Sequence, residues 1–143
     1  MSPNFTLAEL THSDAAVRRG LDNSPDDEAI ANLRKLAATL EEVRSLLGVP
    51  IVISSGYRAP AVNKAVGGSS TSAHCRGLAA DFIAPGFGTP QEVARAIRDS
   101  GIKFDQLIYE GTWVHLSIDP KMRRQVLTAH FNGGPATYTA GIA

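Results

Sequence analysis

Two histidines and one aspartate are the side chains of this sequence that are best suited to bind a metal ion. His74 ends a polar loop, Asp81 follows it within an apolar stretch, and His115 lies farther along the chain, close to Trp113. Imidazole nitrogens and carboxylate oxygens are ligands of Zn²⁺, and three protein ligands leave a fourth position open for water. Such a water has its pKa lowered to about 7 and can attack a carbonyl carbon. The three residues therefore predict a catalytic zinc site, although each of them alone also suits an ordinary hydrogen-bonded role.

Asp81 is the member of this group that is hardest to explain without a metal. It interrupts the apolar run from Leu78 to Ile83. A buried carboxylate without a partner is costly, so it needs a metal ion, a cation or several hydrogen-bond donors. His74 and Asp81 would converge if the chain turned at Gly77, and His115 would point the same way from a strand of alternating polarity.

The other histidines and the single cysteine are not predicted to be ligands. His12 and His130 lack ligand spacing. Cys75 adjoins His74, so the two side chains are expected to point apart and the thiol to be inert. One cysteine also excludes an intramolecular disulfide, so the fold cannot depend on an oxidising compartment.

The elements that must position these residues begin with helices. Two short capped segments precede Gly20. Ser24 followed by Pro25 and several acidic residues predicts the start of a long helix. Its apolar residues recur at spacings of three and four as far as Leu47, and Gly48 ends it. This helix is expected to pack against a sheet.

The rest of the chain alternates strands with short helices. Strands are predicted at residues 50–53, 77–84, 106–118 (a hairpin) and 125–131, and helices at 59–66 and 89–99. The Gly-, Pro- and Thr-rich residues 132–143 are predicted to form a loosely held tail. The sequence therefore predicts a single domain, residues 1–143 with a core over 5–131. Its class is α+β, with N-terminal helices packed on a small, mainly antiparallel sheet that carries the zinc site.

Charge and composition exclude several other classes of function. The 143 residues carry 14 Lys and Arg against 14 Asp and Glu, and these charges are scattered along the chain. Binding to nucleic acid is therefore not expected. No apolar run is long enough for membrane insertion, and the opening residues show no signal peptide. A monomer synthesised in the cytoplasm is the expectation.

Two motifs resemble those of a known family. The pattern S-x-H-x-x-G-x-A-x-D, read from Ser72 to Asp81, is followed by W-x-H at Trp113 and His115. An upstream S-G-Y-R segment ends at Arg58. Together they resemble the zinc D-Ala-D-Ala peptidases, which include the VanX and VanY types and related phage endolysins. The opening residues 5–25 are similar to the phage-type branch, and the resemblance spans residues 5–130.

The resemblance implies a role for each matching residue. His74, Asp81 and His115 match the family's zinc ligands, with one zinc ion per chain. Arg58 matches an arginine beside the substrate carbonyl, where a cation stabilises the developing oxyanion. The residues expected to contact the substrate are Ser72 and Trp113.

The general base departs from the family pattern. Many members carry an acid three residues before the second histidine, and here that position is Thr112. The nearest acid is Glu110. If residues 111–112 form a two-residue turn, Ile108 lies opposite His115, and Glu110 lies diagonal to His115 on the same face of the sheet. Glu110 is therefore predicted to be the base, and the poorer candidates are Asp105 and Asp119.

The function that follows is zinc-dependent hydrolysis of peptidoglycan stem peptides. The expected setting is a phage-type endolysin that is made in the cytoplasm, released with the help of a holin, and active on the cell wall. Two alternatives stay open. The chain could be a non-catalytic, zinc-containing peptidoglycan-binding module that has lost its base, or a housekeeping D,D-carboxypeptidase, and the sequence does not distinguish a carboxypeptidase from an endopeptidase.

Overall fold

The computed structural model describes residues 1–143 and begins with three helices. They are α1 (Leu7–Thr11), α2 (Asp14–Arg19) and α3 (Asp27–Leu47). Helix α3 carries the predicted apolar face, since all of its buried residues except Thr39 are apolar, and Gly48 ends it in the left-handed conformation. Most of its stability must come from packing this face against the rest of the domain.

The start of α3 differs from the prediction. Ser24 was expected to cap the helix, but its hydroxyl donates a hydrogen bond to Asp22 at 2.6 Å instead. Asp26 is the N-cap, and its carboxylate accepts a hydrogen bond from the backbone N–H of Ala29 at 2.8 Å. An aspartate caps as well as a serine does. The helix therefore begins two residues farther along than predicted.

Six strands form one sheet in the order β1-β2-β4-β3-β5-β6. Their bounds are β1 Val52–Ser55, β2 Ala79–Ile83, β3 Gln106–Tyr109, β4 Val114–Ser117, β5 Gln125–His130 and β6 Thr137–Ala140. Every neighbouring pair is antiparallel except β3 and β5, which are parallel. The shorter helices between them are α4 (Pro60–Ala65), the 3₁₀ helix η1 (Ala73–Arg76) and α5 (Pro90–Arg98). The fold is α+β with a mainly antiparallel sheet, as predicted.

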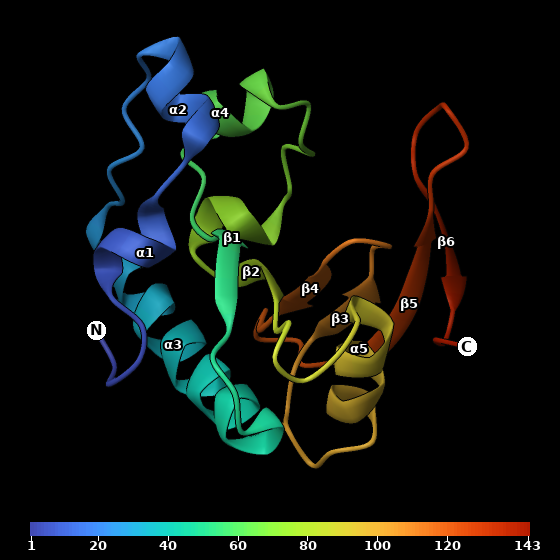
Figure 1. The fold of residues 1–143 in the computed structure, drawn as a ribbon. Coiled ribbons are helices and arrows are strands. Elements are labelled where there is room, and N and C mark those ends of the chain that lie inside the picture. The colour runs from blue at the N-terminus through green and yellow to red at the C-terminus, as the bar shows by residue number, and fades with distance from the viewer.

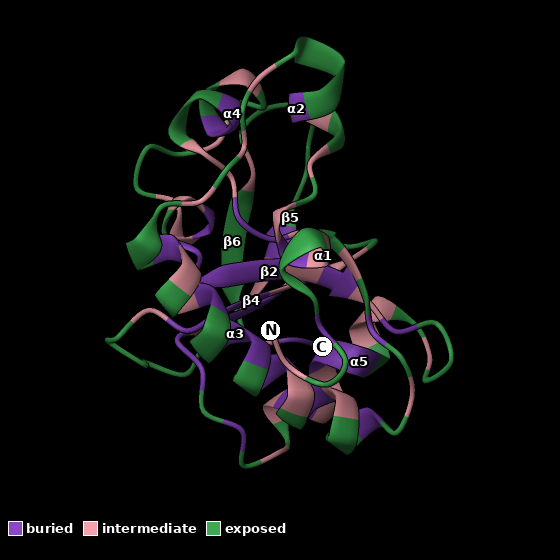
Figure 2. Ribbon diagram, turned by 90° about the vertical axis from the view of Figure 1, so that its left-hand side faces the viewer, coloured by how far each residue is buried: buried purple, intermediate pink, exposed green.

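The two faces of the sheet have different roles. Ala80 and Phe82 of β2 are fully buried in a hydrophobic core that they share with α3 and α5. Side chains alternate along a strand, so Asp81 between them points to the opposite face. Figure 2 shows β2 buried at the centre of the molecule and β6 exposed. The helices thus cover one face, and the other face is left for chemistry.

The C-terminal tail is not loosely held, which corrects the prediction for residues 132–143. Strand β6 pairs with β5 along its length, and Ile142 is buried. Arg95 and Arg98 donate side-chain hydrogen bonds to the carbonyls of Ala143 and Ile142 at 2.6 and 2.7 Å. In Figure 1 the β5–β6 hairpin lies at the end of the molecule away from the N-terminal helices.

None of the helices combines the length and the apolar character that crossing a membrane requires.

Candidate metal centre

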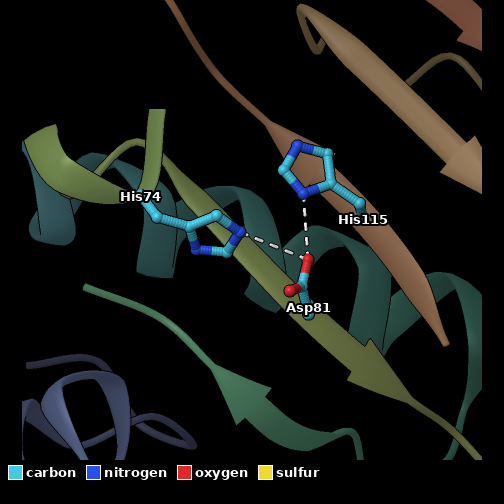
Figure 3. A group of neighbouring side chains, drawn as sticks. All are labelled: His74, Asp81 and His115. Atoms are coloured by element: carbon cyan, nitrogen blue, oxygen red, sulfur yellow. Dashed lines mark hydrogen bonds and ion pairs between the residues drawn. The ribbon is translucent and has the colours of Figure 1, made fainter. Parts of the chain in front are cut away.

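Strand pairing brings two of the predicted ligands together. Asp81 of β2 and His115 of β4 are directly paired residues of antiparallel strands. Paired side chains lie on the same face of a sheet. The Nδ1 atom of His115 is 2.9 Å from Oδ1 of Asp81, as Figure 3 shows. Asp81 and His115 are 34 positions apart in the chain. The backbone hydrogen bonds between β2 and β4 therefore hold them in contact.

The third predicted ligand, His74, is held by a short helix and a backbone carbonyl. It lies in η1, which Ser72 caps and Gly77 ends with a φ of 74°. Its Nδ1 donates a hydrogen bond to the carbonyl oxygen of Gly56 at 2.7 Å, and the residue is 2% exposed. This contact assigns the proton to Nδ1 and leaves Nε2 to face Asp81 Oδ1 at 3.3 Å. Figure 3 shows both imidazoles directed at the same carboxylate oxygen.

The three side chains fit a zinc ion in both distance and chemistry. One ligand atom from each of His74, Asp81 and His115 lies within 4.8 Å of the others. Two neutral imidazoles and a carboxylate make up a donor set that zinc favours. Burial alone would raise the pKa of Asp81, but the contacts that its carboxylate makes with His115 and His74 outweigh this effect and lower that pKa below its usual range. The carboxylate is therefore ionised and ready to bind a cation.

The hairpin between β3 and β4 has the register that the sequence predicted. Ile108 pairs with His115, and the N–H of Glu110 donates to the carbonyl of Trp113 at 3.0 Å. Gly111 in the turn has a φ of 84°, which favours glycine. Glu110 consequently lines the same cavity as the three ligands. Burial is the largest effect on its carboxyl group and raises its pKa, which the nearby His115 only partly offsets.

The two alternative acids already have partners. Asp105 is 2% exposed and accepts hydrogen bonds from the backbone N–H, Nε and Nη2 of Arg123, at 2.9 to 3.0 Å. Asp119 forms an ion pair with Arg76 at 3.2 Å. The hydrogen bonds from Arg123 lower the pKa of Asp105, so it is a weaker proton acceptor than Glu110. Neither acid is free to act as a base in the way that Glu110 is.

Arg58 and Ser72 form the wall next to His74. The backbone N–H of Arg58 donates to the carbonyl of His74 at 3.1 Å, which ties this segment to η1. The Nη2 atom of Arg58 makes a long contact of 3.5 Å with Ser72 Oγ. The Nε of Arg58 is buried and has no hydrogen-bond partner in the protein. The guanidinium thus lines the cavity with one long side-chain contact, to Ser72, as its only hydrogen bond.

All seven predicted site residues line one cavity of about 600 Å³. The list is Arg58, Ser72, His74, Asp81, Glu110, Trp113 and His115. Cys75 is not among the lining residues, and it lies instead beside Lys64 in a separate depression. Burial raises the pKa of its thiol, which disfavours the thiolate that a metal would need. The thiol is therefore outside the ligand group.

Two parts of the site were missed by the sequence prediction. One is the Gly56 carbonyl, which orients His74. It is a backbone atom, and only its place within the S-G-Y-R segment could have drawn attention to it. The other is Tyr138 of β6, which lines the cavity. It was missed because the tail that carries it was expected to be loose.

A protein-family model matches most of the chain. The family model described as Peptidase M15 matches residues 3–117, which include all seven predicted site residues and end with strand β4. No curated protein sequence matches the chain.

Proposed function

The chain belongs to the peptidase M15 family of zinc-dependent metallopeptidases, and we propose that it hydrolyses peptide bonds in the stem peptides of bacterial peptidoglycan. The observation that carries this proposal is the convergence of His74, Asp81 and His115 in a cavity that also contains a carboxylate and a guanidinium. Burial raises the pKa of the Glu110 carboxyl group, which suits a general base that works near neutral pH, whereas a site that only binds peptide has no use for such a base.

One zinc ion would be held by Nε2 of His74, Oδ1 of Asp81 and Nδ1 of His115, the atoms that face one another. When bound, zinc supplies Lewis acidity to the scissile carbonyl and to the water that attacks it. The Gly56 carbonyl keeps His74 in the tautomer that binds through Nε2. The protein's own contribution to metal binding is therefore a rigid, correctly protonated set of ligands.

Two residues would do the chemistry around the metal. Glu110 removes a proton from the attacking water and delivers it to the nitrogen of the leaving amine as the C–N bond breaks. Arg58 stabilises the negative charge that develops on the carbonyl oxygen. Ser72 and Trp113, which both line the cavity, are proposed to contact the peptide. Water adds across one peptide bond, so no further reactant is required.

We place this activity in a phage-type endolysin acting on the cell wall, with a holin supplying its release. The support is the similarity of residues 5–25 to the phage-type branch of the family. A monomer is sufficient for this role, because every proposed site residue comes from the same chain.

The proposal is tested by digestion of purified sacculi with the zinc-loaded protein, with and without a chelator. Mass spectrometry of the released peptides identifies the bond that is cut. We expect release that the chelator abolishes and added zinc restores. Loss of the terminal D-alanine alone would identify a D,D-carboxypeptidase, and cleavage within the stem or cross-link would identify an endopeptidase. Binding of sacculi without any cleavage would contradict the proposal and favour a non-catalytic module.

A further inference from the structure

The C-terminal hairpin of β5 and β6 contributes a residue to the cavity. Tyr138 of β6 lines it together with Glu110 and Trp113. This tyrosine lies beyond residues 3–117, the segment that matches the peptidase family. Tyr138 therefore lines the site from a part of the chain that lies outside the matched segment.

The register of the sheet explains how Tyr138 reaches Glu110 across an intervening strand. Tyr109 pairs with Thr128, so Glu110 comes level with Ala129 at the next position, and Ala129 pairs with Tyr138. Side chains at paired positions share a face of the sheet. Ala129 is 8% exposed and carries only a methyl group. The small residue leaves room for the phenol ring to approach the carboxylate.

The pKa of Tyr138 agrees with a position close to Glu110. The pKa of Tyr138 is raised, first by partial burial and then by the negative charge of Glu110. The tyrosine is nevertheless 52% exposed. Its ring is therefore near the base but not packed into the core, so much of its surface is available to a ligand.

Trp113 lies across the β3–β4 turn from Glu110, whose backbone N–H donates a hydrogen bond to its carbonyl. Its ring packs against Phe131 with a centroid distance of 6.2 Å. Its indole N–H is buried without a hydrogen-bond partner, yet it lies close enough to Glu110 to influence that residue's pKa. Glu110 thus has one aromatic neighbour in the turn before β4 and another in β6. Aromatic rings provide a large contact area at a low cost in side-chain entropy.

We infer that Tyr138 is a substrate-binding residue whose ring packs against the peptide beside the bond that is cut. The partner is a stem peptide, whose flat amide groups and small apolar side chains can lie against a phenol ring. This inference rests on the proposed function and adds the residue that borders the Glu110 side of the groove. Tyr138 acts on binding, and proton transfer remains with Glu110.

The test uses the full-length, zinc-loaded Glu110→Gln protein, so that the peptide is bound but not consumed. Calorimetric titration with a purified soluble stem pentapeptide measures Kd in this background. Addition of Tyr138→Ala is expected to raise Kd about tenfold, the equivalent of about 1.4 kcal/mol for one aromatic contact. Tyr138→Phe keeps the ring and should restore a Kd within about twofold of the parent, the small change expected when only the polar handle is lost. Thr137→Ala on the same exposed strand is the matched control and should leave Kd unchanged.

Steady-state kinetics of the active protein, in which Glu110 is unchanged, provides the second readout. Tyr138→Ala should raise KM and leave kcat nearly unchanged, because a contact made equally in the ground and transition states affects binding alone. An unchanged Kd in Tyr138→Ala, or a fall in kcat without a rise in KM, would overturn the inference while leaving the proposed function intact. A wild-type protein that neither binds nor cleaves stem peptides would overturn the proposed function and this inference with it.

Discussion

The Nδ1 atom of His115 lies 2.9 Å from Oδ1 of Asp81, at a directly paired position of β2 and β4. Two of the three proposed ligands are therefore fixed by the backbone hydrogen bonds of the sheet and not by flexible loops. The third, His74, is oriented by the carbonyl of Gly56 at 2.7 Å. Sites built on regular elements hold their geometry more closely than sites on loops. The metal site is thus largely formed by the fold itself.

Gly56→Ala tests how tightly this arrangement is packed. A Cβ atom at position 56 would clash with the backbone carbonyl oxygen of Leu10, which cannot move independently of α1. We expect the free energy of unfolding to fall by about 1–3 kcal/mol, the usual cost of overpacking. Chemical denaturation of the zinc-free protein measures it. Gly101→Ala is the control, since nothing lies within 4 Å of its added Cβ, and equal stability of the two variants would contradict the proposed close approach.

Glu110→Gln tests the identity of the base. The substitution keeps the size and most contacts of the side chain but removes its ability to accept a proton from water. We expect zinc content and fold to be retained and the rate to fall about 10²- to 10⁴-fold, the usual contribution of a general base. Thr112→Ala, at the position where many family members carry the acid, should have near-normal activity. Near-normal activity in Glu110→Gln would redirect the search to Asp105 or Asp119.

The pH dependence of kcat/KM tests the environment of Glu110. A general base must be ionised, so activity falls as the pH drops through its pKa. Burial raises the pKa of Glu110 in the metal-free protein and moves the acidic limb to higher pH, whereas the positive charge of a bound zinc ion moves it to lower pH. This limb should disappear in the residual activity of Glu110→Gln. An identical limb in both proteins would show that another group controls it.

Arg58→Ala tests the proposed stabilisation of the oxyanion. The partner of the guanidinium develops mainly in the transition state, so kcat should fall about 10²- to 10³-fold, as for loss of one oxyanion donor. Zinc content should stay the same, because Arg58 is not one of the ligands. Steady-state kinetics and metal analysis of the same preparation measure both quantities. An unchanged kcat would assign Arg58 a role in packing beside η1.

Local patterns were sufficient to predict the parts of the site that depend on neighbouring residues. The turn at Gly111 and the alternation along β4 determine the register that brings Glu110 into the cavity. The buried position of Asp81 follows from its apolar neighbours, because alternation puts it on the face opposite Ala80 and Phe82. These relationships depend on the geometry of neighbouring residues in a turn or strand, which can be predicted from the order of the residue types.

Long-range relationships were harder to predict. Strand β6 follows residues 132–136, whose Gly and Pro content is typical of loops, and it is held by pairing with β5 and by the arginines of α5. The start of α3 depends on which side chain caps it. The Ser24 hydroxyl donates its hydrogen bond to Asp22, and Asp26 is the residue that caps the helix. The contact of the Gly56 carbonyl with His74 joins two segments through a backbone atom, which side-chain patterns do not reveal. In each case a tertiary partner decided the outcome.

Zinc content of the purified protein is the most direct test of the central claim that His74, Asp81 and His115 form a metal site. Mass spectrometry of the metal should find about one zinc per wild-type chain, since a three-residue donor set of this type holds a single ion. His115→Ala should lose nearly all of it under the same dialysis. His12→Ala, which removes an exposed imidazole paired only with Asp14, should retain it. Full retention of zinc by His115→Ala would contradict the ligand assignment on which the proposed function rests.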